Sequence, residues 1–265
     1  MRQRAYQALD SKQFKLAIQF LNKTKEKDHF ALAIAYHQGT NDFKRAITHY
    51  KKAANIGQAD AFNNLGLIHL HQKHNQKEAY RAFTRAVEKG SQIAHYNLGL
   101  YHLEQEKDLV AAIDHFEKAA SYGNSSASLA LAQLYFHQFK KPNQAIMILT
   151  EAAANGNPKA NYQLGLIYLN HKKDIDSALH YFQEYLRSPS TKTLSLPLGL
   201  ILLKHEAYPF LQNLFETKPE IKATALPLYY ALLKCDKNAV KDEVLKMGWE
   251  LETTVKEIVE LIENN

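Results

Sequence analysis

Small and apolar residues recur along the chain with a period of 33 residues. The segments 52–70, 85–103, 118–136 and 151–169 align without a gap. Five columns of this alignment are nearly constant: Ala53, Ala86, Ala119, Ala152; Gly57, Gly90, Gly123, Gly156; Ala61, Ala94, Ala127, Ala160; Leu65, Leu98, Leu131, Leu164; and Gly66, Gly99, Ala132, Gly165. Such a period predicts an array of similar structural units that stack on one another.

A second apolar series predicts the other half of each unit. It pairs an alanine with a large apolar residue four positions later: Ala46 with Tyr50, Ala79 with Phe83, Ala112 with Phe116, Ala145 with Leu149, and Ala178 with Phe182. Residues four apart share one face of an α-helix. Each unit is therefore predicted to be a helical hairpin.

The sequence predicts different structural roles for the two glycine columns. The earlier one, exemplified by Gly57, is predicted to adopt the left-handed conformation that ends the second helix of a hairpin. The later one, exemplified by Gly99, is predicted to let neighbouring backbones approach closely. Leucine in place of Gly99 should then overpack the helix crossing and cost about 1–3 kcal/mol.

The two ends of the chain are less regular than its middle. Residues 1–26 are predicted to form a degenerate N-terminal helical hairpin, and residues 27–187 hold the repeats of 33 residues. Within residues 188–265, the segments 196–204 and 226–234 resemble each other, and TTVKEIVELIE places its apolar residues on one helical face. We expect degenerate C-terminal hairpins and an amphipathic capping helix there, because the last unit of an array needs a polar outer face.

Composition narrows the class of protein and its location. The chain is 46% hydrophobic and 23% charged, with a net charge of +6, and only 10 glycines and 7 prolines leave little room for disordered linkers. No apolar run approaches the about 18 residues of a membrane span. The single cysteine, Cys235, cannot form an internal disulfide and favours a reducing compartment. We expect a cytoplasmic protein or one exported into a host cell, with a cleaved signal segment as an open alternative.

Catalytic and metal-binding motifs are missing from the sequence. The patterns GxGxxG, GxxxxGK[ST], GxSxG and HExxH do not occur. The 13 histidines raise a metal hypothesis at His69, His71 and His74, but no carboxylate or cysteine completes a tetrahedral set. Other repeats carry tyrosine or asparagine in the same columns, which favours surface packing. No catalytic residue, metal ligand or cofactor is predicted.

The repeated phrase KAAxxGxxxAxxxLGxxY, present as KAANIGQADAFNNLGLIH and EAAANGNPKANYQLGLIY, resembles the hallmark of the Sel-one-like repeat (SLR) family. This family lies within the tetratricopeptide (TPR) superfamily, and the resemblance covers about residues 27 to 187. It implies an all-α fold, a right-handed α/α superhelical solenoid of stacked antiparallel helix pairs. Two features depart from the family: the loop between paired helices is short, and the cysteine pairs of one bacterial branch are absent.

The resemblance also implies a binding surface. In these families the first helix of each hairpin lines a concave groove, and transferring that register selects candidate contacts with a peptide or partner: Asn63, Asn64, Tyr96, Asn97, Leu100, Phe136, Tyr162, Gln163 and Leu166. Amide side chains can hydrogen-bond the backbone of an extended peptide, while tyrosine and leucine pockets accept its side chains. The alternative is that Asn64 and Asn97 cap or bridge neighbouring helices and the leucines belong to the core.

Together these features predict a protein without catalytic activity, a scaffold or adaptor with a protein or peptide partner. A bacterial effector is one form of this prediction. A regulatory or carrier subunit of an enzyme complex is the alternative, and a hydrolase is the weaker one. No nucleic-acid partner is predicted, because the basic residues, such as Lys51 and Arg85, lie on the second helices and do not form a basic groove. The sequence leaves the partner's identity and the oligomeric state open.

Overall fold

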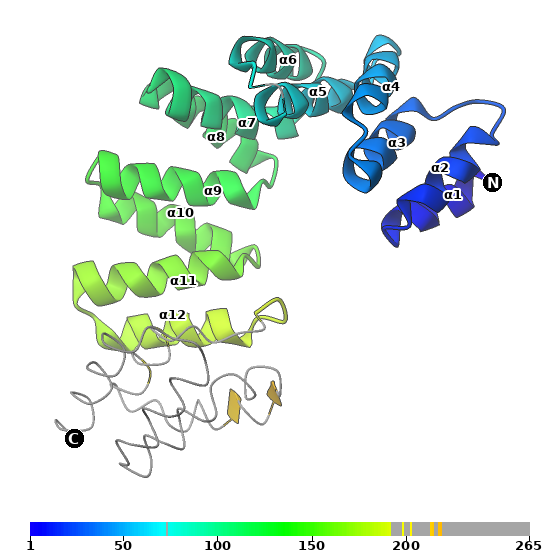
Figure 1. The fold of residues 1–265 in the computed structure, drawn as a ribbon. Helices are drawn as coiled ribbons and strands as arrows, with labels where there is room; N and C mark the ends of the chain where they lie inside the picture. Colours follow the sequence, from blue (N-terminus) through cyan, green and yellow to red (C-terminus); the bar gives the residue numbers. More distant parts are fainter. Residues whose placement is uncertain (73, 192–197, 199–201, 203–212, 215–216, 219–265) are drawn as a thin grey trace, which may run out of the picture. The chain divides into compact units, whose positions relative to one another are not determined.

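The computed structural model describes residues 1–72 and 74–191, together with residues 198, 202, 213, 214, 217 and 218. Its contacts divide the chain into two units, Met1–Leu134 and Tyr135–Asn265. Within residues 1–72 and 74–191 the regular elements are all helical (Figure 1). None of these helices combines the length and apolar character needed to cross a membrane.

The first unit consists of antiparallel helix pairs. Its elements are α1 (Arg2–Asp10), α2 (Phe14–Asn22), α3 (His29–Ile34), η1 (Ala35–Gly39), α4 (Phe43–Asn55), α5 (Ala59–His71), α6 (Gln76–Glu88), α7 (Ile93–Tyr101), η2 (His102–Glu106), α8 (Leu109–Ser121) and α9 (Ser125–Gln133). The η elements are single π-helical turns that continue the first helix of a hairpin. Each helix from α2 to α8 packs on the helix that precedes it and on the one that follows.

The second unit repeats this arrangement. Its helices are α10 (Pro142–Ala154), α11 (Pro158–Ile167), η4 (Tyr168–Lys172) and α12 (Ile175–Arg187), and the π-helical turn η3 (Leu134–Gln138) begins at the last residue of the first unit. Helix α11 packs against both α10 and α12. The all-α solenoid of stacked antiparallel helix pairs predicted from the sequence is confirmed.

The glycine column at the ends of the second helices adopts the predicted left-handed conformation. Gly57, Gly90, Gly123 and Gly156 have φ angles of 92°, 90°, 82° and 82°. At the first of these, Gln58 N–H donates to the carbonyl of Ala53 at 3.1 Å, and Gly57 N–H donates to that of Ala54 at 3.0 Å. This pair of bonds is the Schellman motif, in which the glycine closes the helix and reverses the chain.

Replacing Gly90 with alanine isolates the contribution of this backbone conformation. A Cβ atom at Gly90 would meet nothing within 4 Å, so the substitution adds no steric clash. We expect the free energy of unfolding to fall by about 1–2 kcal/mol, because an L-residue is strained in the left-handed region. Urea denaturation would measure the loss, with the adjacent exposed Lys89→Ala as control. Equal stability of the two variants would contradict the assignment.

The second helices begin at a polar cap that also recurs along the chain. The side chains of Asp42 and Asn75 accept hydrogen bonds from the backbone N–H of Arg45 and Glu78, at 3.0 and 3.1 Å. Asp108 and Asp174 cap α8 and α12 in the same way. Such caps satisfy backbone donors that have no partner inside the helix, and they fix where these four helices start.

The later glycine column makes room for an aromatic ring. A Cβ atom at Gly66, Gly99 or Gly165 would lie 2.4–2.6 Å from the ring of Phe83, Phe116 or Phe182, respectively. The sequence predicted a close approach of backbones at this column, and the structure shows instead that the first helix presents a flat surface to a ring on the second helix. Where this column holds Ala132, the ring column holds the smaller Leu149.

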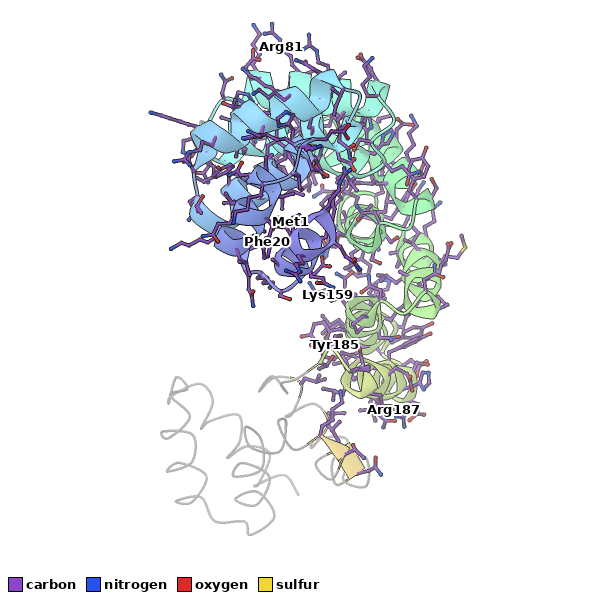
Figure 2. The ribbon with its side chains drawn as sticks, turned by 90° about the vertical axis from the view of Figure 1, so that its right-hand side faces the viewer. Met1, Phe20, Arg81, Lys159, Tyr185 and Arg187 are labelled. Atoms are coloured by element: carbon purple, nitrogen blue, oxygen red, sulfur yellow. The ribbon has the colours of Figure 1, made fainter. Side chains whose placement is uncertain are left out.

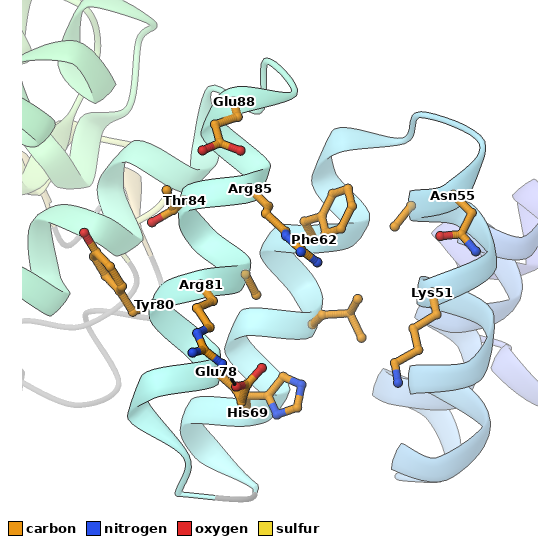
Figure 3. Close-up of a pocket in the computed structure, with 13 residues that line it drawn as sticks. Lys51, Asn55, Phe62, His69, Glu78, Tyr80, Arg81, Thr84, Arg85 and Glu88 are labelled. Atoms are coloured by element: carbon orange, nitrogen blue, oxygen red, sulfur yellow. Dashed lines mark hydrogen bonds and ion pairs between the residues drawn. The ribbon is translucent and has the colours of Figure 1, made fainter.

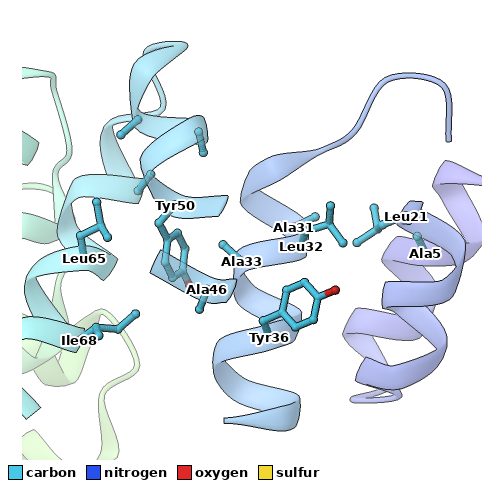
Figure 4. Close-up of a cluster of buried hydrophobic side chains, with 13 residues drawn as sticks. Ala5, Leu21, Ala31, Leu32, Ala33, Tyr36, Ala46, Tyr50, Leu65 and Ile68 are labelled. Atoms are coloured by element: carbon cyan, nitrogen blue, oxygen red, sulfur yellow. The ribbon is translucent and has the colours of Figure 1, made fainter. Parts of the chain in front are cut away.

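Alanine, leucine and aromatic side chains form the core of the first unit. Figure 4 shows one cluster in which Tyr50 lies beside Ala46 and Leu65, while Leu21 and Leu32 close the space between α2 and α3. All five side chains are at most 6% exposed. Burial of these side chains joins neighbouring hairpins of the first unit, as a repeat array requires.

The predicted boundaries 1–26, 27–187 and 188–265 stay predictions. The division of contacts after Leu134 separates two structural units within the repeat segment and does not test them. Most of residues 188–265, including the proposed C-terminal hairpins, the capping helix and Cys235, lies outside the described residues.

Candidate functional site

Asn63 and Asn97 form a hydrogen-bonded pair between adjacent hairpins of the first unit. The Asn97 Nδ2 atom on α7 donates to Asn63 Oδ1 on α5 at 2.6 Å. Asn63 is only 2% exposed, whereas Asn97 is half-buried. Asn63 therefore holds the amide plane of Asn97 in place. Asn97 thus bridges neighbouring hairpins, as the alternative reading of the sequence allowed, and its partner is Asn63.

The Asn97 amide keeps hydrogen-bonding capacity beyond this pair. Its Oδ1 atom and second amide hydrogen have no partner among the described residues. An amide can donate two hydrogen bonds and accept two. The geometry thus combines a structural bond on one side of Asn97 with available donor and acceptor groups on the other.

Asn64 lies against the buried Tyr50. The Tyr50 hydroxyl is also 3.4 Å from His37 Nδ1, so the phenol is close to polar groups of both its own hairpin and the next. Burial raises the pKa of Tyr50 well above its ordinary value, and the hydrogen bond with Asn64 acts in the opposite direction. Asn64 is half-buried.

Tyr96 and Tyr162 occupy equivalent positions in the two units. The Tyr96 ring lies 5.8 Å from the buried Phe116 ring, and the Tyr162 ring lies 5.9 Å from that of Phe182. Both tyrosines are half-buried, so each presents part of its ring to solvent. A ring supported in this way can offer a contact surface at low entropic cost.

The remaining candidates are half-buried, and both units contribute to them. Leu100 is on α7 of the first unit, whereas Gln163 and Leu166 are on α11 of the second. Phe136, on η3 in the second unit, has its ring 4.9 Å from His137 and 5.6 Å from His171. Assignment of all nine residues to partner binding stays a prediction.

A layer of stacked rings lies between the first and second helices of a hairpin and was not expected from the sequence. In the hairpin of α7 and α8 it consists of His95, His102 and His115, which we call the ring layer. His115 stacks on His102 with centroids 5.3 Å apart and an interplanar angle of 7°, and its Nδ1 is 3.0 Å from that of His95. His102 is 9% exposed, so the surface packing inferred for its column is wrong there.

Two members of the ring layer, His95 and His115, are in surroundings that favour the neutral imidazole. Burial, together with the neighbouring His95 and His102, lowers the pKa of His115 to about 4. Burial also lowers the pKa of His95. Glu106 Oε2 lies 2.7 Å from His102 Nδ1. Within the described residues, no three His, Cys, Asp or Glu side chains are arranged to hold a metal ion.

Models of repeat families match along most of the helical array. The Sel1 repeat model matches residues 26–58, 125–157 and 158–184, and a tetratricopeptide repeat model matches residues 77–127. The chain contains Sel1 repeats and a tetratricopeptide repeat. The resemblance seen in the sequence is confirmed. Repeats of these families generally mediate contacts between proteins and are generally non-catalytic.

Several solved structures are similar to the protein. A Sel1 repeat protein from Oxalobacter formigenes has a TM-score of 0.60 at 22% identity, covering 76% of this chain and 88% of its own. A protective antigen of uropathogenic Escherichia coli with an SLR fold has a TM-score of 0.45 at 21% identity, covering 95% and 66%. An immunity protein from Pseudomonas aeruginosa has a TM-score of 0.40 at 21% identity, covering 60% and 62%. No curated protein sequence matched.

This Sel1-repeat protein also has a hollow on its first unit, between α4, α5 and α6. Its volume is about 750 Å³. Figure 3 shows Phe62 and His69 on its α5 side and Lys51 reaching from α4, and Ala82 of α6 also lines it. The sequence did not predict this hollow. The available signal was that Ala82 occupies a column that holds His115 in the next repeat.

Proposed function

We propose that this Sel1-repeat protein is a non-catalytic adaptor that binds a peptide or partner helix along the first helices of its hairpins. The observation that carries the proposal is the Asn63–Asn97 pair. Its 2.6 Å bond fixes the Asn97 amide while leaving donor and acceptor groups for a partner's backbone. A preorganised side chain loses less conformational entropy when it binds.

The supported tyrosines extend this proposal. Tyr96 precedes Asn97 on α7, and Tyr162 stands beside Gln163 on α11. Each unit therefore offers a half-buried ring and an amide in adjacent positions, on which one segment of a partner could pack. If the partner is an enzyme, the protein would act as its regulatory or carrier subunit. The proposed location, cytoplasm or host cell, is supported only by the single cysteine.

The test is affinity capture of partners by the Tyr96→Ala/Asn97→Ala variant, read by quantitative mass spectrometry. We expect recovery of specific partners to fall at least about tenfold, which corresponds to about 1.4 kcal/mol of binding free energy. The structure adds a cost in stability, since loss of Asn97 removes the donor to buried Asn63, worth about 1–3 kcal/mol.

Gly90→Ala supplies the matched control for that cost. It is expected to destabilise the same unit by a similar amount, yet it lies in the loop between α6 and α7 and is not one of the proposed contact residues. Capture retained by Gly90→Ala and lost by the double variant would support binding at α7. Capture at the wild-type level by the double variant would overturn the proposal.

A further inference from the structure

Other hairpins contain stacked rings in the same columns as the ring layer, but with different side chains. In the hairpin of α3 and α4, His49 stacks on Tyr36 at 5.6 Å and 20°, and its Nδ1 is 2.9 Å from that of His29. In the hairpin of α11 and α12, Tyr181 stacks on Tyr168 at 5.4 Å and 20°. In each case a ring on the second helix lies flat on a ring near the end of the first helix.

The hairpin of α5 and α6 lacks this second-helix ring. Its residues in the same three columns are Phe62, His69 and Ala82. All three line the hollow of about 750 Å³ (Figure 3). The neighbouring residues Ala79 and Phe83 are fully buried, as their counterparts are in the other hairpins. The framework around the missing ring is thus maintained, and the methyl group of Ala82 leaves its space open.

The rim of the hollow carries an excess of positive charge. Arg81 projects away from α6 with its side chain 59% exposed, and it pairs with Glu78 at 2.6 Å (Figure 2). Lys51 and Arg85 have no ion pair among the described residues, and Glu88 is the one remaining acidic side chain of the lining. Apart from the Arg81–Glu78 ion pair, the lining therefore carries two positive charges and one negative charge. An acidic group near the ring would complement this rim.

From these observations we infer that the hollow receives one aromatic side chain of a protein partner, stacked on His69, with an acidic residue of the partner beside Lys51 and Arg85. The other repeats show which shape fits this space: an imidazole at His49 and His115, and a phenol at Tyr181. A single ring fills only part of 750 Å³, so residues flanking it occupy the remainder. This site lies between α4, α5 and α6 and does not depend on binding at Asn97.

Small aromatic probes test the hollow without knowledge of the partner. p-Cresol represents a tyrosine side chain, and 4-hydroxyphenylacetate adds a carboxylate. We expect saturable binding of both to the full chain in NMR titrations, with the largest shift changes at residues of α4, α5 and α6. Absence of saturable binding, or changes centred on other helices, would overturn the inference.

Substitutions at Ala82 and at His115 should change probe binding in opposite directions. Ala82→Tyr supplies the missing ring, as Tyr181 does in its own hairpin, and should weaken binding of both probes at least about tenfold. Ala82→Ile, chosen because Ile148 occupies the same column, gives a second filled variant if the tyrosine disturbs folding. His115→Ala should open an equivalent space in the next hairpin and add a second site. Unchanged binding by a folded Ala82 variant would refute the site.

A comparison of the two probes tests the role of the charged rim. Lys51→Gln/Arg85→Gln should weaken 4-hydroxyphenylacetate several-fold more than p-cresol, because only the former carries a negative charge. Equal weakening would refute the acidic neighbour. The Tyr96→Ala/Asn97→Ala variant separates this inference from the proposed adaptor function, because it should leave p-cresol binding intact. If this variant captures partners as well as the wild type does, the proposed contact surface on α7 is wrong, but the inferred ring site in the hollow is not affected.

Discussion

Gly99→Ala is expected to lower the free energy of unfolding by about 1–3 kcal/mol, although it adds only one methyl group. The new Cβ atom would lie 2.6 Å from Cδ1 and Cε1 of Phe116. Phe116 is fully buried and has no room to retreat, so either its ring or the packing of α7 on α8 must shift. The loss would be measured by urea denaturation monitored by circular dichroism.

A double-mutant cycle tests whether the Phe116 ring is the cause. The same columns elsewhere combine Ala132 with Leu149, which suggests that Phe116→Leu accommodates an alanine at position 99. We expect the double variant to be more stable than the sum of the single effects predicts, with a coupling of about 0.5–3 kcal/mol. Additivity of the two substitutions would show that Gly99 is required for a different reason.

Acidification from pH 7 to pH 4 is expected to destabilise the first unit through His115. In the unfolded chain this histidine titrates near its ordinary pKa of 6.5, whereas in the folded protein burial and its histidine neighbours lower the pKa to about 4. Between these values the unfolded chain binds a proton that the folded protein does not. The contribution of His115 is therefore fully present above pH 6.5 and is lost as the pH falls towards 4.

The magnitude follows from the groups that face His115. His95 and His102 from the first helix and Lys118 on its own helix oppose a charged imidazole, while Asp114 favours it. Because the ring is only partly buried, solvent screens these interactions, and we expect about 1–2 kcal/mol.

His115→Tyr, which reproduces the residue found at Tyr181 in another hairpin, should remove this pH dependence. Its unfolding free energy should change by about 1–2 kcal/mol less than that of the wild type between pH 7 and pH 4. His71→Gln, which replaces an exposed histidine at the end of α5, is the matched control. If His115→Tyr and the control respond to pH as the wild type does, the ring layer does not control acid stability.

Much of the fold could be predicted from the sequence because its determinants are local. The period of 33 residues, the apolar pairs such as Ala112 with Phe116, and the left-handed glycines act within one hairpin.

The candidate site was harder to predict from the sequence. Asn63 and Asn97 were both selected by register, but the register did not show that Asn63 is buried and bound to Asn97.

The sequence by itself determined the repeat, the hairpins, the ends of the second helices and the family. Only the tertiary structure decided which groups meet: Gly99 with the Phe116 ring, Asn63 with Asn97, and Phe62 and His69 around the space above Ala82. A column of aligned residues specifies which side chain each repeat carries at a position. Burial, hydrogen bonding and open volume depend on distances between hairpins, and packing sets those distances.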